Sequence, residues 1–269
     1  MTNENANAKA KEPRSLSEIL ADAEATETWA QQMNQQIDEK LEQHVQDLLV
    51  RIKILKTRTH DPNRSDEIKQ TFEEAIKLEE SNDLKRVAMW EYVSYLEEQG
   101  DCETAIPLAE KYLTYIEPNG DKSQIADATN MLGQLYAAAG ASKQAQQKFI
   151  QANGIYEQLV AENPSVSYQA KLAKTCYDLG TLYADYGDSH HMDFAKQELL
   201  RAKRIYEQLV AENQSTYLID LAKACYCLGI VYACTNCPEL ANEEFCRSRD
   251  LFEQDSKIHR LLNLDEEDL

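Results

Sequence analysis

Five of the seven cysteines of this chain lie between Cys225 and Cys246, in the segment "CYCLGIVYACTNCPELANEEFC". Their spacing includes Cys225-x-Cys227 and Cys234-x-x-Cys237, and thiolates so close in sequence can bind zinc or exchange disulfides. A structural zinc site needs four ligands that converge on one ion. On a helix, side chains two residues apart diverge by about 200°, so Cys225 and Cys227 face different directions.

The cysteine cluster has counterparts upstream that lack it. Cys225 stands at the position of Cys176 and Thr129 in two similar segments, so each cysteine is a single substitution in a repeated helical frame. We therefore expect free thiols with no metal and no disulfide, and the odd number of cysteines also disfavours full pairing. Redox sensing stays open as an alternative, as does a weak three-ligand site formed by Cys227, Cys234 and Cys237.

His190 and His191 are the other candidate metal ligands, with Asp188 and Asp193 beside them. We interpret this segment as a solvated loop, with a weak metal site as the alternative. The sequence has no glycine-rich phosphate loop, nucleophile elbow or His-Glu-x-x-His helix. We therefore expect no catalytic, cofactor-binding or metal-binding residues, no cofactor, and no enzymatic activity.

The charged residues of the chain limit the classes of partner that it can bind. There are 28 Lys and Arg residues against 47 Asp and Glu, a net charge of −19, which disfavours nucleic acid and anionic membranes as partners. The first residues lack the apolar core of a signal peptide, and we see no apolar run near the roughly 20 residues that span a bilayer. We expect a cytoplasmic protein. With 8 Gly and 6 Pro in 269 residues, an all-helical fold is favoured.

The chain repeats itself. The nonapeptide "IYEQLVAEN" occurs at Ile155 to Asn163 and again at Ile205 to Asn213. Upstream of each copy, and once more after the second copy, a Leu-Gly pair is followed by Tyr three residues after the Gly. The three sets are Leu132, Gly133 and Tyr136; Leu179, Gly180 and Tyr183; and Leu228, Gly229 and Tyr232.

Each unit predicts two amphipathic helices joined by a short turn. In the second helix, small and large residues recur one turn apart: Ala145, Phe149, Ala152; Ala195, Leu199, Ala202; and Ala241, Phe245, Ser248. The turns carry Gly140, Gly187 and Asn236, which tolerate the left-handed conformation that ends a helix. We expect the Gly of the first helix and the Ala residues of the second to let the two helices approach closely.

These residues resemble the tetratricopeptide repeat, clearly over about 125–256 and more weakly over Ala88 to Pro118. The units are longer than the usual length of about 34 residues, and are similar to those of kinesin light chains and many bacterial repeat proteins. The resemblance implies an all-α fold: a right-handed α-solenoid of antiparallel helix pairs, preceded by N-terminal helices.

We divide the chain into a disordered tail at 1–14, an N-terminal helical region at 15–83, a repeat array of about four helix pairs at 84–256, and an acidic tail at 257–269. An apolar seam from Trp29 to Leu55 predicts one long helix in the N-terminal region. This region could be a cap, a degenerate repeat, or a helix that self-associates with a second copy.

The first helices of such units line the concave face of the solenoid, where a peptide or protein partner binds. We expect the partner-binding groove to be formed by Asn130, Gln134, Lys174, Tyr177, Asp178, Thr181, Lys223, Tyr226, Cys227 and Ile230. Tyr177 and Tyr226 occupy equivalent positions, so they either form an aromatic shelf for a peptide or simply pack on neighbouring helices. Asp178 stands where a chaperone-tail clamp needs a cation, which disfavours that ligand.

These expectations together predict a non-catalytic scaffold or adaptor that binds a protein or peptide. The alternative is a peptide-responsive bacterial regulator of the quorum-sensing type, in which a helical bundle likewise precedes the superhelix. The sequence does not identify the partner.

Overall fold

The computed structural model describes residues 16–57, 63–77, 82–118, 120–212 and 215–267. This part of the chain contains ten α-helices, one short 3-10 turn and no strand, so the all-α prediction is confirmed. The chain forms two compact units, Met1–Ala88 and Met89–Leu269. The tail predicted at 1–14 lies outside the described residues.

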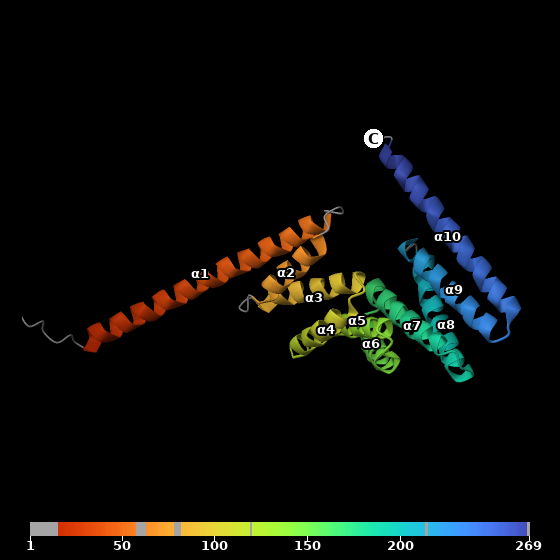
Figure 1. Ribbon diagram of the computed structural model, residues 1–269, viewed down its shortest axis with the longest axis horizontal. Helices are drawn as coiled ribbons and strands as arrows, with labels where there is room; N and C mark the ends of the chain where they lie inside the picture. Colours follow the sequence, from red (N-terminus) through yellow and green to blue (C-terminus); the bar gives the residue numbers. More distant parts are fainter. Residues whose placement is uncertain (1–15, 58–62, 78–81, 119, 213–214, 268–269) are drawn as a thin grey trace, which may run out of the picture. The chain divides into compact units, whose positions relative to one another are not determined.

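The first unit is built on α1 (Leu16–Thr57) and α2 (Arg64–Lys77), which pack against each other (Figure 1). The predicted seam of α1 is buried only in its C-terminal half, at Val45, Leu48, Ile52 and Leu55. In the N-terminal half, Trp29, Met33 and Ile37 are exposed. The unit boundary falls inside α3 (Asn82–Glu98), as does the boundary predicted at residue 83.

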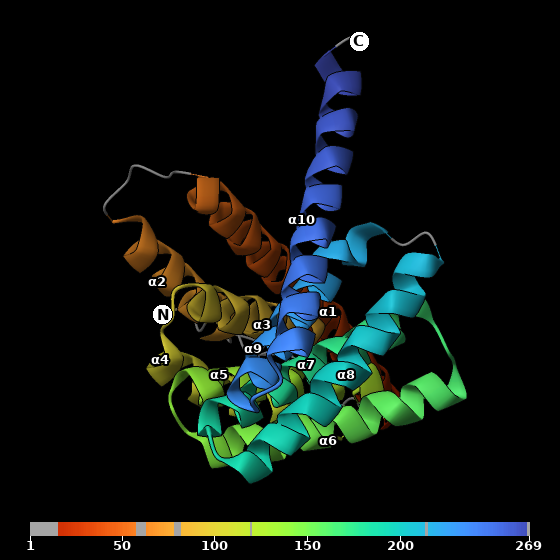
Figure 2. The same cartoon turned by 90° about the vertical axis from the view of Figure 1, so that its right-hand side faces the viewer.

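The second unit is a series of antiparallel helix pairs. They comprise the rest of α3, then α4 (Cys102–Ile116), α5 (Lys122–Ala138), α6 (Ser142–Glu162), α7 (Val166–Tyr186), α8 (Ser189–Ala211), α9 (Leu218–Cys234) and α10 (Pro238–Glu267), with the 3-10 turn η1 (Ser215–Tyr217) before α9. Each helix from α4 to α10 packs on the next, and α7 also contacts both α5 and α9 (Figure 2). The first helices of successive pairs therefore form one continuous inner layer.

The turns inside the pairs use the predicted residues. Gly140 and Gly187 both have a φ of 74°, and Asn236 has a φ of 59°, which confirms their left-handed conformation. The helix that follows is often capped by a carboxylate: the side chain of Asp188, for example, accepts a hydrogen bond from the backbone N–H of His191 at the start of α8. Left-handed ends and carboxylate caps together keep the turns short.

The close approach of the two helices in each pair is also confirmed. A Cβ atom added to Gly133 or Gly229 would lie 2.6 Å from the ring of Phe149 or Phe245. At Gly180 it would lie 2.8 Å from Leu199 Cγ and 3.1 Å from the backbone nitrogen of the same residue. A larger residue at Gly180 would meet the α8 backbone, whereas at Gly133 or Gly229 the phenylalanine ring would have to move.

The structure continues α10 to Glu267, so the acidic tail predicted at 257–269 is helical over 257–267. The physical reason is that α10 contains no glycine, and its one proline, Pro238, occupies the first helical position, where proline is tolerated. Nothing in the sequence therefore stops the helix after the last repeat position.

Among the described residues, the segment Ser215–Cys234 is long and apolar enough to span a membrane by length and composition, a segment that our reading of the sequence missed. Half of it is buried inside the protein, where α9 packs between α8 and α10. Burial in the repeat core accounts for its apolar composition.

Candidate functional site

The inner layer of the second unit contains a cavity of about 220 Å³. Side chains from four helices line it: Trp90 of α3; Asp127, Asn130, Met131 and Gln134 of α5; Tyr156 of α6; and Lys171 and Lys174 of α7. Three of the four helices are first helices of their pairs, the helices that are predicted to line the groove.

One wall of the cavity is a closed group of polar side chains. Lys171 Nζ lies 2.6 Å from Asp127 Oδ2, and the Tyr156 hydroxyl donates a hydrogen bond to Asp127 Oδ1. Burial, and then the hydrogen bond to Asp127, raise the pKa of Tyr156 above its ordinary value, so the phenol stays protonated. This group ties α5, α6 and α7 together.

A second polar group surrounds the carboxylate of Asp178. Gln134 Nε2 donates a hydrogen bond to Asp178 Oδ2 at 2.8 Å, Asn130 Nδ2 lies 3.4 Å from the same oxygen, and Lys174 Nζ lies 3.5 Å from it. Burial raises the pKa of Asp178, whereas Lys174 and the two amides lower it. The structure thus brings together four of the predicted groove residues.

The amide of Asn130 is only half satisfied. A carboxylate only accepts hydrogen bonds, so the NH₂ group of Asn130 must face Asp178. Its carbonyl oxygen is then buried without a partner. An unsatisfied buried acceptor costs about 1–3 kcal/mol, and a donor that reaches it after a small rotation of the amide recovers part of that energy.

The opposite edge of the cavity is apolar. The indole of Trp90 lies 5.3 Å from the ring of Tyr112, centroid to centroid, and both Trp90 and Met131 are only half-buried. Lys174 is exposed beside them. The cavity therefore offers an apolar contact, amide groups and one accessible ammonium group.

Three further predicted groove residues contribute to packing within the array. The Cys227 thiol lies 3.5 Å from the Tyr177 hydroxyl, and Tyr177 packs against both core clusters of the unit. Burial raises the pKa of Tyr177 above its ordinary value. Thr181 donates a hydrogen bond to the backbone carbonyl of Asp178 within α7. Tyr177 and Cys227 thus join α7 to α9.

The remaining three predicted residues lie on α9. Lys223 pairs with Asp220 at 3.8 Å, and Ile230 and Tyr226 are exposed. The ring of Tyr226 lies 5.5 Å from that of Phe245, centroid to centroid. Tyr177 and Tyr226 therefore have different surroundings despite their equivalent positions.

All seven cysteines are free thiols in the structure. Burial is the main cause that raises the pKa of Cys176 and Cys225 to about 12, so neither forms a thiolate readily. His191 Nδ1 lies 2.5 Å from Asp188 Oδ2 at the start of α8, and its ring stacks on Tyr186. In the part of the chain that the structure describes, no three His, Cys, Asp or Glu side chains are grouped to hold a metal ion.

Five cavity residues were not predicted as site residues: Trp90, Asp127, Met131, Tyr156 and Lys171. Tyr156 carried a signal, because it lies in the repeated nonapeptide and recurs as Tyr206. Asp127 and Lys171 meet across two helix pairs, a contact that no local spacing reveals.

No protein-family model matches the sequence, and no curated protein matches it. Solved structures do. BtubC (BKLC) from P. vanneervenii is 18% identical with a TM-score of 0.60, over 80% of this chain and 91% of that one. The apo form of RapI is 13% identical with a TM-score of 0.65, over 80% of this chain and 72% of that one. MamA is 18% identical with a TM-score of 0.51, over 75% of this chain and 98% of that one.

At these identities the likeness establishes the fold. It agrees with the repeated glycine of the first helices, which the structure places against Phe149, Leu199 or Phe245 of the second helix in three successive pairs. The chain therefore has the fold of a tetratricopeptide-type helical repeat protein.

Proposed function

We propose that this protein is a non-catalytic scaffold or adaptor that binds an extended peptide segment of a partner protein on the inner layer of its second unit. The observation that carries the proposal is the cavity between α3, α5, α6 and α7, which combines an apolar edge with amide groups and a lysine. Recognition sites are typically concave and mostly apolar, with a few polar groups that fix the ligand's orientation.

The chemistry of the cavity suits a peptide bond next to an apolar side chain. Trp90 and Met131 supply the apolar contact, and the amides of Asn130 and Gln134 lie beside it. A peptide N–H can donate to the unpaired carbonyl oxygen of Asn130 once that amide rotates. Lys174 provides a charge at the edge that favours an acidic or carboxyl-bearing neighbour.

The ligand would continue along the inner layer toward α9. Lys223 and Ile230 are exposed there, and they offer the same combination of a cation with an apolar contact. We keep the expectation that nucleic acids and membranes are not partners, since the net charge is −19. The cytoplasm is the compartment that fits this proposal.

A second candidate is a peptide-responsive regulator. It is favoured by one observation: residues 1–88 form a compact helical unit of their own ahead of the repeat array. In such a regulator the peptide would bind the same inner layer and the N-terminal unit would act on another protein. The two candidates share the ligand site and differ in the role of the first unit.

Selection of peptides from a random displayed library tests the ligand site. Peptides enriched on the wild-type protein should bind Met131→Asp at least about tenfold more weakly, as expected for a central apolar contact. Lys174→Glu should weaken binding less and in a salt-dependent way, because this lysine is exposed.

Lys143→Glu is the matched control, since Lys143 is exposed on α6 and does not line the cavity. Far-ultraviolet circular dichroism of each variant verifies its helical content. Failure to enrich any peptide, or equal binding by wild type and Met131→Asp, contradicts the proposal.

A further inference from the structure

The last helix pair, α9–α10, exposes the positions that earlier pairs use to hold the pair that follows them. Successive second helices align through their small residues, so that Ala152, Ala202 and Ser248 are equivalent. Counting four residues on from each, Tyr156, Tyr206 and Phe252 occupy one position. The first two are 2% and 3% exposed, whereas Phe252 is 41% exposed.

The first helices show the same pattern. Asn130 of α5 contacts Asp178 of α7, and the equivalent Tyr177 of α7 contacts Cys227 of α9. Tyr226 is the next residue in this series and is 52% exposed. Among the described residues, no further helix covers it.

Charged positions repeat in the same way. Glu157 of α6 pairs with Arg201 of α8 at 2.6 Å, and Glu207 of α8 pairs with Arg247 of α10 at 2.7 Å. Glu253 is the equivalent residue of α10. In the part of the chain that the structure describes, no following second helix brings an arginine to it.

A basic residue of α8, Lys203, also has an uncovered equivalent on α10. It pairs with Glu244 of α10, and both side chains are largely buried. Its equivalent on α10 is Arg249, which is exposed and only touches the neighbouring Asp250 at 3.3 Å. Arg249 and Glu253 are thus presented one turn apart on an open face.

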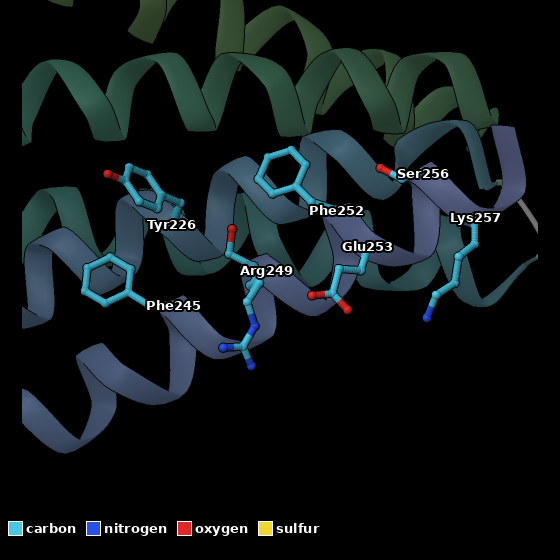
Figure 3. A pocket seen from close by; sticks show the side chains of 8 residues that line it. Tyr226, Phe245, Arg249, Phe252, Glu253, Ser256 and Lys257 are labelled. Carbon is cyan, nitrogen blue, oxygen red and sulfur yellow. The ribbon is translucent and has the colours of Figure 1, made fainter. Parts of the chain in front are cut away.

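These residues line a single open depression of about 720 Å³ along α9 and α10 (Figure 3). Figure 3 shows the aromatic rings of Tyr226, Phe245 and Phe252 on one surface with the charged side chains of Arg249 and Glu253. A face that combines exposed aromatic rings with charged residues is typical of a protein–protein contact.

The order of the charged residues along α10 indicates which partner fits this face. In the α8–α10 contact, Lys203 then Glu207 meet Glu244 then Arg247 in the same chain direction. Arg249, Glu253 and Lys257 follow one another a turn apart along this face, as base, acid and base. An antiparallel second copy that places Arg249 opposite Glu253 makes two equivalent opposite-charge contacts, whereas a parallel copy shifted by one turn pairs different residues of the two chains. The antiparallel contact is self-complementary, which is the requirement for a two-fold symmetric interface.

We propose that two copies of this chain associate through their α10 helices, antiparallel about a two-fold axis. Arg249 of each copy meets Glu253 of the other, and Phe252 lies near the axis between them. Tyr226 and Phe245 extend the apolar contact onto the partner. The dimer closes the face that the last helix pair leaves uncovered, and it leaves the cavity between α3 and α7 free for a ligand.

Sedimentation velocity of the full-length chain, over a range of concentrations, tests this dimer by charge exchange. Arg249→Glu and Glu253→Arg should each weaken self-association at least about tenfold, because each puts like charges opposite one another. An equimolar mixture of the two variants should associate, since the heterodimer restores two opposite-charge contacts. The double variant should self-associate like the wild type.

Gln254→Arg is the matched control. Gln254 adjoins Glu253 in the chain but points to another side of α10, and its equivalents Gln158 and Gln208 are also exposed. It should leave the dimer unchanged. Circular dichroism verifies that the single variants keep their helices.

Two results would overturn the proposal. One is a wild-type chain that stays monomeric up to its highest soluble concentration. The other is a dimer that persists in both single charge variants, or that is lost instead in Trp29→Glu, which would assign association to the exposed seam of α1.

Discussion

Replacing Gly180 should separate α7 from α8. A Cβ atom at Gly180 would lie 2.8 Å from Leu199 Cγ, 3.1 Å from the Leu199 backbone nitrogen and 3.2 Å from the Ala195 carbonyl oxygen. Two of these three atoms belong to the α8 backbone, so rotation of one side chain cannot relieve the contact. Overpacking of this kind costs about 1–3 kcal/mol.

The helical propensity of alanine partly offsets that cost. Alanine is favoured over glycine inside a helix by about 1 kcal/mol. We therefore expect Gly180→Ala to lower the free energy of unfolding by up to about 2 kcal/mol. Gly180→Leu should lower it further, because its additional atoms enter the same contact. Gly229→Ala should be milder, since its Cβ meets only the ring of Phe245, which is half-buried and can rotate.

Gly154→Ala is the matched control. Gly154 lies inside α6, and no atom lies within 4 Å of its added Cβ, so alanine should stabilise the protein by about 0.5–1 kcal/mol. Urea unfolding followed by far-ultraviolet circular dichroism measures both changes, compared at equal m-value. If Gly180→Ala stabilises as much as Gly154→Ala, the close helix contact is not where we place it.

Two further outcomes are expected. Burial raises the pKa of Asp178, so the folded state binds the carboxyl proton more tightly than the unfolded chain does. The contribution of Asp178 to the free energy of unfolding therefore falls as the pH rises from the unfolded pKa of 3.8 through the raised folded pKa. Asp178→Asn should therefore gain stability relative to wild type across that window, and parallel unfolding curves for both proteins from acid to neutral pH would contradict the assignment. The chain should also keep its helical content in a metal chelator, with Cys176 and Cys225 unreactive toward thiol reagents until it unfolds; one bound zinc whose removal melts helices would contradict this.

The repeat architecture could be predicted because its sequence signal is a contact between neighbours. Gly180 and Leu199 must face each other for two helices to pack closely, so their types and spacing carry structural information in every unit. The turns carry a similar local signal at Gly187 and Asn236. The C-terminal end of α10 has no such local signal, because helix-forming residues continue past the last repeat position and no glycine or proline follows there to end the helix.

The site was less predictable, because equivalent positions acquire their chemistry from the next unit. Asp178 is held by Gln134 and Asn130, which come from the preceding pair. Cys227 stands at the position of Asp178, and it meets the hydroxyl of Tyr177 there. A single sequence shows that these positions recur, but not which pairs of side chains meet across the units.

Tyr177 and Tyr226 show how strongly the surroundings of a repeated position depend on the next unit. Their sequence positions are equivalent, yet α9 covers Tyr177 while Tyr226 stays exposed beside Phe245. Only the position of each unit in the array separates them. In a stacked repeat each unit contacts only its neighbours, so a residue that the next unit covers in one pair is exposed in the last pair that the structure describes. The exposed residues of α9 and α10 are therefore the ones proposed to contact a second copy, and charge exchange at Arg249 and Glu253 tests that proposal directly.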